Sequence, residues 1–325
     1  MRTGGEARFF CVVKNIKELR EAIQFSKNKN KKFFVLGEGS NAIFSDRGFD
    51  GLIIKNEIKG KEIKNPNNNF SLLKCGAGEK WDEVVLFSLK NKLFGLENLS
   101  NIPGTVGASA VQNIGAYGAE ARNFIKEVEV FDVKSFQISS ISNQECSFGY
   151  RDSIFKKKKD LIIISVTYKL SKIFIPNLKY LELKNIFSNK TVDNFSVEDI
   201  RDVVIGLRKF KLPEVNELGS VGSFFKNPIL DNKVYKKILL KFPALPKFEI
   251  DKKSVKIPLG FVLDKICLLK GYRKGDVGLY EKQALVIVNY GKATSRDVVK
   301  FSKEIKKIVK DKTGLEIEEE AEIVL

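Results

Sequence analysis

The chain has 325 residues, 43% of them hydrophobic, and its 57 Lys and Arg outnumber its 40 Asp and Glu. This length suffices for a sizeable core in two or three domains, and the absence of a signal peptide or a long apolar run predicts a cytoplasmic protein. Histidine is absent, which excludes every catalytic triad, zinc site or proton transfer that needs an imidazole.

The first third of the chain alternates between expected helices and strands. Asn15 is an N-cap residue before a helical stripe of apolar residues, and residues 33–36 indicate a buried strand. This strand runs into the loop Gly37-Glu38-Gly39-Ser40-Asn41, a type of loop in which backbone N–H groups can bind an anion. Strands over 51–55 and 71–75 precede an amphipathic helix that begins near Trp81.

Residues 102–120 form a glycine-rich stretch with almost no charge. Pro103 fixes one backbone angle, and Gly104 and Gly107 permit turns that other residues avoid. After Gly107 a short helix can begin whose free N–H groups face an anion, for which a pyrophosphate is the simplest candidate. The spacing matches neither common nucleotide-binding fingerprint, and a plain glycine-rich turn between packed helices is the alternative.

Further elements follow in the second half of the chain. Residues 161–164 indicate a core strand, and Ser196 opens a helix that ends near Lys209. Residues 233–240 and 259–267 indicate helices, residues 284–288 a strand, and residues 295–312 a long helix closed by Gly314. The last strand is expected over residues 317–324, where Glu318, Glu320 and Glu322 would share one face.

Three strings in the sequence resemble one family. NIPGTVGASAVQNIGAYGAE, FGYRDSIFK and GSFFKNP are similar to segments of bacterial UDP-N-acetylenolpyruvoylglucosamine reductase, a flavoenzyme of peptidoglycan precursor synthesis. The resemblance continues along nearly the whole chain, and a segment around Tyr180 places it with the type I branch.

The resemblance implies an α+β fold, with a two-lobed FAD-binding domain of the vanillyl-alcohol-oxidase type and a smaller α+β substrate-binding domain. We expect the first FAD-binding lobe over residues 1–57 and the second over 58–205. The substrate-binding domain is expected over 206–314, and the final strand, within 315–325, is expected to return to the second lobe.

The resemblance also assigns the site residues, without a metal. FAD binding falls to the following residues: Gly37, Glu38, Gly39, Ser40, Asn41, Pro103, Gly104, Thr105, Gly107, Ala108, Gln112, Asn113, Gly115 and Tyr117. Substrate binding falls to these residues: Tyr150, Tyr180, Lys211, Lys226, Asn227 and Gln283. The family's closing Leu-Glu-Pro-Glu-Val motif aligns its second glutamate with Glu322, with Glu320 as the alternative.

The implied reaction is the NADPH-dependent reduction of UDP-N-acetylglucosamine enolpyruvate to UDP-N-acetylmuramate through FAD. In this scheme Ser223 gives a proton to the substrate, Arg151 binds its carboxylate, and Glu322 supplies a further hydrogen bond. We expect a monomer whose partners are small molecules, the UDP-sugar substrate and NADPH. We expect it to bind neither nucleic acid nor a membrane.

Two other functions fit parts of the sequence. One is another FAD oxidoreductase of the same fold, such as an alcohol oxidase, which would not need Ser223 together with Arg151 and Glu322. The other is a basic nucleic-acid-binding protein, which the excess of lysine could indicate.

The four cysteines have no CxxC spacing, which argues against a zinc or disulfide framework and favours core positions.

Overall fold

The computed structural model describes residues 1–188, 191, 194–214 and 217–324. The chain forms two compact units, each assembled from segments far apart in sequence. We call residues 7–39 and 50–208 the N-terminal unit, and residues 1–6, 40–49 and 209–325 the C-terminal unit. Among the described residues, no helix has the length and apolar character needed to span a membrane.

The N-terminal unit contains two main sheets. In the three-stranded sheet the order is β1 (Ala7–Val13), β4 (Phe49–Asn56) and β2 (Lys32–Leu36), and β2 runs parallel to β4. The five-stranded sheet is antiparallel, in the order β10 (Ile138–Ser142), β9 (Ile125–Asp132), β11 (Leu161–Ser171), β6 (Phe70–Gly76) and β5 (Lys61–Lys64). A two-stranded ribbon joins β7 (Gly115–Ala116) to β8 (Ala119–Glu120).

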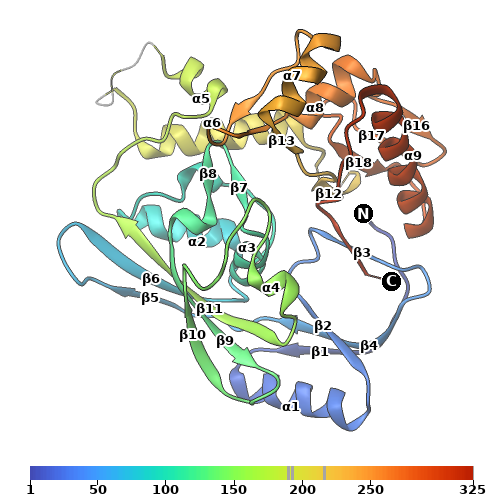
Figure 1. Ribbon diagram of the computed structural model, residues 1–325. Coiled ribbons are helices and arrows are strands. Elements are labelled where there is room, and N and C mark those ends of the chain that lie inside the picture. Colours follow the sequence, from blue (N-terminus) through green and yellow to red (C-terminus); the bar gives the residue numbers. More distant parts are fainter. Residues whose placement is uncertain (189–190, 192–193, 215–216, 325) are drawn as a thin grey trace. The chain divides into compact units, whose positions relative to one another are not determined.

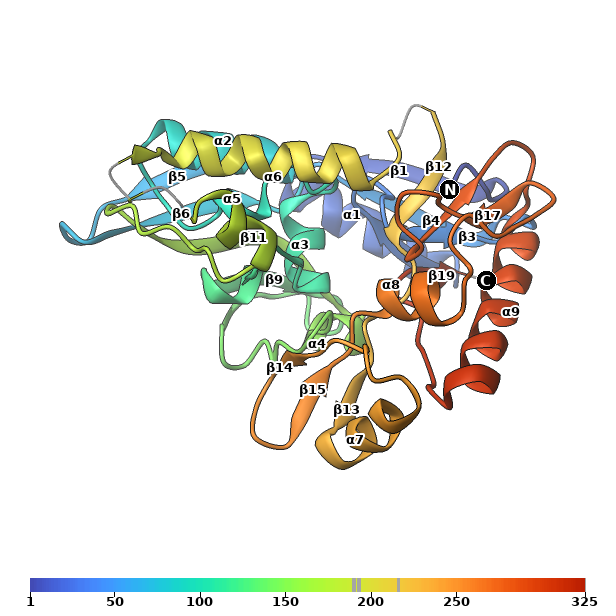
Figure 2. The same ribbon diagram turned by 90° about the horizontal axis from the view of Figure 1, so that it is seen from above.

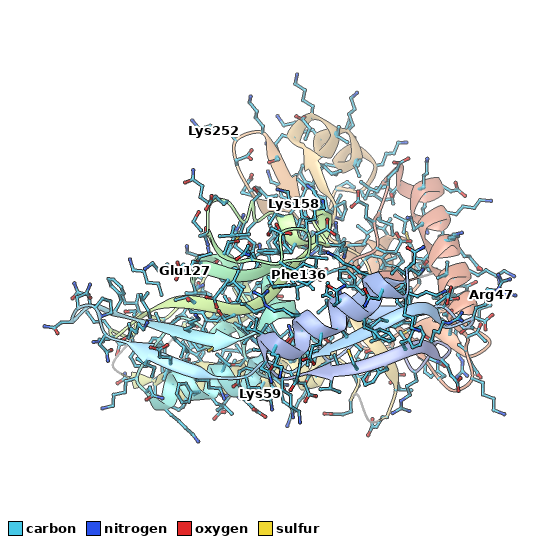
Figure 3. The ribbon with its side chains drawn as sticks, turned by 90° about the horizontal axis from the view of Figure 1, so that it is seen from below. Arg47, Lys59, Glu127, Phe136, Lys158 and Lys252 are labelled. Atoms are coloured by element: carbon cyan, nitrogen blue, oxygen red, sulfur yellow. The ribbon has the colours of Figure 1, made fainter. Side chains whose placement is uncertain are left out.

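Helices cover these sheets (Figure 1). The helix α1 (Ile16–Asn28) begins where Asn15 Oδ1 accepts the amide of Glu18 at 2.9 Å, and its apolar stripe packs on the three-stranded sheet. Figure 3 shows Phe136 beside α1, and the Nζ of Lys27 lies 4.2 Å from the centre of that ring. The other elements are α2 (Trp81–Lys90), η1 (Glu97–Leu99), α3 (Val106–Gln112), η2 (Ala121–Asn123), α4 (Ile154–Lys157), α5 (Leu181–Ile186) and α6 (Val197–Lys211).

The C-terminal unit also mixes strands and helices. Its four-stranded sheet has the order β12 (Gly219–Ser223), β18 (Val286–Asn289), β17 (Val277–Leu279) and β16 (Arg273–Lys274). A smaller sheet has the order β13 (Ile229–Asp231), β15 (Ser254–Lys256) and β14 (Phe248–Glu249). Its helices are α7 (Asn232–Lys241), the short α8 (Leu259–Phe261) with a π-helical turn at Val262–Ile266, and α9 (Ser295–Thr313). Gly314, with φ of 74°, ends α9 as the sequence predicts.

The last strand is shorter than expected and pairs elsewhere. Only β19 (Glu322–Val324) is a strand, and it runs parallel to β3 (Ala42–Phe44) in the C-terminal unit, instead of joining a strand within residues 58–205. Residues 317–321 are outside any strand, so periodicity alone does not place their side chains on one face. Leu325, included in the expected final segment, lies outside the described residues. The C-terminal unit begins its long segment at residue 209 and also takes in residues 1–6 and 40–49, and the expected domain boundaries stay predictions.

Thiol chemistry is limited by burial. The side chains of Cys75, Cys146 and Cys267 are buried, and Cys11 is half-buried. Burial raises the pKa of the Cys75 and Cys146 thiols to about 12. These two thiols therefore stay protonated near neutral pH and act as core residues.

An ion pair fastens α6 to α2. In Figure 2, α6 is the long yellow helix that passes in front of α2. The two terminal nitrogens of Arg201 donate to the two carboxylate oxygens of Asp82 at 2.8 and 2.6 Å, and Asp82 also accepts the Asn101 amide at 2.5 Å. Burial opposes ionisation of Asp82, yet the hydrogen bonds from Arg201 and Asn101 bring its pKa below the ordinary value. Asp82 therefore links α6 to the first turn of α2 and to the loop at Asn101.

Replacing Arg201 by Met should lower the free energy of unfolding by about 2 kcal/mol at pH 7, because Asp82 loses its counter-charge in a half-buried setting. A depressed folded-state pKa contributes stability above the unfolded value of about 4, and this contribution is lost as the pH falls through the folded value. The difference between the two proteins should therefore narrow on acidification well below pH 4.

Urea unfolding followed by circular dichroism at pH 7 and under acid conditions measures both effects. Glu83→Gln is the matched control on α2, because Glu83 pairs with Lys80 at 3.7 Å with both side chains more than half exposed. This control should change stability by less than about 0.5 kcal/mol. If the free energy of unfolding of the Arg201→Met protein were unchanged, the stabilising role of this ion pair would be refuted.

Candidate functional site

The N-terminal unit brings the two predicted glycine loops together. Residues 37–39 follow β2, and residues 103–105 lead into α3. A Cβ added to Gly37 would lie 2.9 Å from Thr105 Oγ1, and Glu38 Oε2 accepts the amide of Gly104 at 2.8 Å. Gly39 and Gly104 have φ of 71° and 126°, a region that favours glycine. The loops therefore form one surface that side chains at these glycines would fill.

The helix amides are arranged differently from the expectation. The amides of residues 106–109 all donate within the protein, the first two to the carbonyl oxygens of Glu79 and Ala77 at 2.9 Å. The other two donate to Thr105, which caps the helix. The prediction that free N–H groups of this helix face an anion is therefore wrong, because neighbouring carbonyls occupy those groups. The amide of Gly104 is likewise engaged, by Glu38.

A lysine that sequence reasoning missed lies at the same loops. Lys55 lies opposite Leu36 in the β2–β4 pairing, and its Nζ donates to the Gly37 carbonyl at 2.6 Å. A cation at the end of an otherwise apolar strand is the signal that could have found it. Together with the glycine surface, this charge fits the anionic diphosphate of a dinucleotide cofactor.

Arg151 is placed against the end of the glycine-rich stretch. Its guanidinium donates to the Gly115 carbonyl and lies 5.2 Å from the ring centre of Tyr150. A Cβ at Gly115 would approach the arginine's Nη1 to 2.7 Å, so only glycine allows this approach. Arg151 itself has φ of 54°, a left-handed conformation that the surrounding contacts must maintain.

Buried polar contacts hold the Arg151 loop in place. Asn113 is fully buried, and its Nδ2 donates to the Gly149 carbonyl at 2.7 Å while its Oδ1 accepts the amide of Arg122 at 3.0 Å. Ser153 Oγ donates to the Val111 carbonyl at 2.7 Å. The loop and the predicted flavin segment thus form a single hydrogen-bonded assembly.

Tyr180 lies against the same segment. Its ring meets that of Tyr117 edge to face, with centroids 5.1 Å apart. Burial raises the pKa of both phenols, so both stay neutral near neutral pH. Tyr180 is thereby positioned next to a residue predicted to bind the cofactor.

The C-terminal unit brings Ser223 next to the acidic end of the chain. Ser223 ends β12, and the next residue, Phe224, accepts the amide of Glu320 through its carbonyl at 2.7 Å. Phe225 pairs with Glu319 in an antiparallel bridge. The amide of Glu322 instead donates to the carbonyl of Asn41 at 2.9 Å.

Two of the predicted substrate residues of this unit, Asn227 and Gln283, lie next to α8. Asn227 Oδ1 accepts the amide of Leu259 at 2.9 Å, and a Cβ at Gly260 would lie 2.8 Å from Gln283 Oε1. The Nζ of Lys226 lies 3.3 Å from Glu318 Oε2. Lys211 is the last residue of α6.

The two units share out the predicted site residues. The N-terminal unit holds residues 37–39, 103–117, 150, 151 and 180, and the C-terminal unit holds residues 40, 41, 211, 223, 226, 227, 283 and 322. Ser223 and Glu322 therefore belong to one unit, and Arg151 belongs to the other.

Comparisons with known proteins match two parts of the chain. Residues 7–135 match the family profile described as FAD binding domain. Residues 213–324 match the profile described as UDP-N-acetylenolpyruvoylglucosamine reductase, C-terminal domain.

Curated relatives match almost the full chain. The UDP-N-acetylenolpyruvoylglucosamine reductase of Flavobacterium johnsoniae is 39% identical over 322 residues, which is 98% of this chain and 94% of the relative. The same enzyme of Buchnera aphidicola subsp. Baizongia pistaciae is 37% identical, covering 98% and 94%. The crystal structure of the enzyme from Thermus caldophilus shares the fold, with a TM-score of 0.68, 23% identity and coverage of 97% and 92%. The chain therefore belongs to the UDP-N-acetylenolpyruvoylglucosamine reductase family.

Proposed function

We propose that this protein reduces UDP-N-acetylglucosamine enolpyruvate to UDP-N-acetylmuramate, with NADPH as hydride donor and FAD as bound cofactor, in peptidoglycan precursor synthesis. The observation that carries the proposal is the glycine surface formed by residues 37–39 and 103–105, in a chain that matches both the FAD binding profile and the reductase's own C-terminal profile. We propose that this reaction on a nucleotide sugar takes place in the cytoplasm. We also expect the protein to be a monomer.

FAD fits the residues present at these loops. Gly37 lets the two loops meet, Gly39 and Gly104 supply the left-handed turns beside which the diphosphate would lie, and Lys55 would supply a nearby positive charge. When bound, FAD supplies the relay of a hydride from NADPH to C3 of the enolpyruvyl group. The residues of the chain bind the substrate and manage charge and protons around that transfer.

Arg151 is proposed to bind the substrate carboxylate. Negative charge accumulates on this carboxylate once a hydride has reached C3, and a delocalised cation with a fixed donor geometry stabilises it. The left-handed backbone at Arg151 and its contact with Gly115 hold the guanidinium in one place. This pre-organisation lowers the cost of orienting the charge during the reaction.

Ser223 is proposed to give its hydroxyl proton to C2 of the substrate. It ends β12 directly after Gly222, whose φ is 72°, and directly before the buried Phe224. The pairing of residues 224–226 with residues 318–320 fixes the backbone that carries the hydroxyl. A rigid support of this kind suits a proton donor.

The burial pattern favours Glu320 over Glu322 as the partner carboxylate. If the family's Leu-Glu-Pro-Glu-Val motif begins at Ile317, its two apolar ends fall on Ile317 and Ala321, which are 3% and 7% exposed. If its second glutamate is Glu322, the leucine position falls on the charged Glu319. The amide of Glu320 is also bonded next to Ser223, whereas that of Glu322 is bonded to Asn41. We therefore propose Glu320 for the role first assigned to Glu322.

The positive charge does not by itself point to nucleic acid. The cations labelled in Figure 3, Arg47, Lys59, Lys158 and Lys252, come from four separate loops. A basic nucleic-acid-binding protein would lack flavin colour and would bind DNA with steep salt dependence. A yellow preparation with a flavin spectrum therefore separates the two functions.

Replacing Ser223 by Ala should lower the rate of product formation by about a thousandfold, because the proton donor is lost. Anaerobic reduction of the flavin by NADPH should keep its rate within about twofold, since that step needs no proton at C2. Stopped-flow absorbance separates the two half-reactions. Ser220→Ala, on the same strand, is the control and should retain both rates. Normal product formation by the Ser223 variant would exclude the proton-donor role.

The choice between the two glutamates is tested by Glu320→Gln and Glu322→Gln. We expect the first to lower the rate of flavin reoxidation by the substrate at least about a hundredfold, the scale of a lost electrostatic or proton-transfer group. Glu322→Gln should lower the rate of flavin reoxidation by less than about fivefold. The reverse ranking would restore the assignment to Glu322.

Replacing Gly37 by Val should weaken FAD binding about tenfold or more, roughly 1.4 kcal/mol, because the added side chain meets Thr105 Oγ1 and separates the loops. Titration of the apoprotein with FAD, followed by flavin fluorescence, measures the change. Gly206→Ala is the control, because Gly206 lies on α6 with nothing within 4 Å of its added Cβ. Equal FAD affinity in the Gly37 variant would show that the loop contact is not part of the cofactor site.

A further inference from the structure

The side chain of Asn98 joins two segments that are far apart in the sequence. Asn98 lies in η1, is 1% exposed, and donates through Nδ2 to the carbonyl oxygens of Tyr117 and Asn177, both at 2.8 Å. Only the NH₂ group of an amide can donate to two carbonyls, which fixes the orientation of this side chain. Its Oδ1 is buried and accepts no hydrogen bond from the described part of the chain. The position therefore uses Asn98 as a double donor.

Asn177 returns a hydrogen bond to the same turn. Its Nδ2 donates to the Gly118 carbonyl at 3.0 Å, and its Oδ1 accepts the amide of Lys179 at 3.2 Å. Tyr117 and Gly118 have φ of 46° and 83°, so the turn uses left-handed backbone at two successive residues. Such a turn persists when its surroundings hold it. Here two side-chain hydrogen bonds join the turn to Asn98 and to Asn177, and a third joins Asn98 to the Asn177 carbonyl.

Tyr180 is attached to this assembly. Its ring meets the Tyr117 ring edge to face, and its amide nitrogen lies 3.4 Å from the position of a Cβ on Gly118. Both tyrosines also pack against a small apolar cluster that includes Leu183 and Val204. The turn at Tyr117 and Gly118, residue 177 and Tyr180 thus contact one another, and Asn98 hydrogen-bonds to the first two.

We propose that Asn98 is a positioning residue that couples the binding of FAD to the binding of the substrate's nucleotide. This inference rests on the proposed function and on the assignments that the family resemblance implies, in which Tyr117 binds FAD and Tyr180 binds the substrate, here through its UDP group. A ligand that fixes the turn at Tyr117 also fixes Tyr180, so the second ligand has less motion to restrict. Linkage requires the effect to be reciprocal, so each ligand tightens the binding of the other by the same factor.

The test measures the affinity for UDP alone by calorimetry, with the apoprotein and with the FAD-loaded protein. The unmodified protein should bind UDP about tenfold more tightly when FAD is present, within the usual range of coupling between sites. In Asn98→Ala this ratio should fall to about one to two, on the same scale, with little change in the affinity of the apoprotein. An unchanged ratio would overturn the proposal.

Asn143→Ala is the matched control. Asn143 also donates through Nδ2 to two backbone carbonyls of the N-terminal unit, those of Arg122 and Ile125, at 2.9 and 2.7 Å. Its replacement should leave the UDP ratio unchanged. Asn177→Ala removes the side-chain bonds to Gly118 and Lys179 but keeps the backbone carbonyl that accepts from Asn98. It should lower the ratio partway, so it tests the proposal even if Asn98→Ala does not fold. A full ratio in Asn177→Ala would count against the coupling.

The route through Tyr180 is tested by a double-mutant cycle. If Asn98 acts through Tyr180, Asn98→Ala should have no further effect on the UDP ratio in the Tyr180→Ala protein. If Tyr180→Ala weakens UDP binding while Asn98→Ala preserves the ratio, the coupling proposal fails and the proposed function stands. If Tyr180→Ala leaves UDP affinity unchanged, the substrate-binding assignment of Tyr180 fails, and the coupling route fails with it.

Discussion

The close approach of Gly37 to Thr105 is the contact on which the rest of the proposed cofactor site depends. It lets the loop after β2 lie against the loop before α3, and the bond from the Gly104 amide to Glu38 closes the same junction. The parallel pairing of β2 with β4 then brings Lys55 to the Gly37 carbonyl. A side chain at residue 37 would separate these parts, since backbone and capping groups leave no spare volume there.

Buried amides and ion pairs do much of the work of ordering the loops of the N-terminal unit. Asn113 joins the glycine-rich stretch, residues 102–120, to the Arg151 loop, and Asn98 joins the same stretch to residue 177. Arg201 and Asp82 fasten α6 to α2 in the same way. Loops lack the repeating backbone bonds of helices and sheets, so their polar groups must be satisfied by side chains such as these. The loops that contain the predicted site residues are therefore ordered by side-chain hydrogen bonds to neighbouring helices and loops.

Most regular elements were predictable because their signals are local. The N-cap at Asn15, the capping box that begins at Ser196 and the glycine after α9 all act where the sequence predicts. The α+β class and the family membership follow from strings such as NIPGTVGASAVQNIGAYGAE, and the comparisons confirm both. The expected strand over 317–324 was too long, because residues 318–321 bond to residues 224–226 instead of extending the β19–β3 pairing.

The sequence by itself determined the family, the glycine loops and the candidate residues Ser223 and Arg151, because these depend on residue types at fixed spacing. Only the tertiary structure decided that carbonyls take up the amides of residues 106–109, and that the last strand pairs with β3. It also decided that Glu320, not Glu322, is bonded beside Ser223, and that Asn98 joins residues 117 and 177. Hydrogen-bond partners far apart in the chain are chosen by packing in three dimensions, and local residue patterns contain no record of that choice.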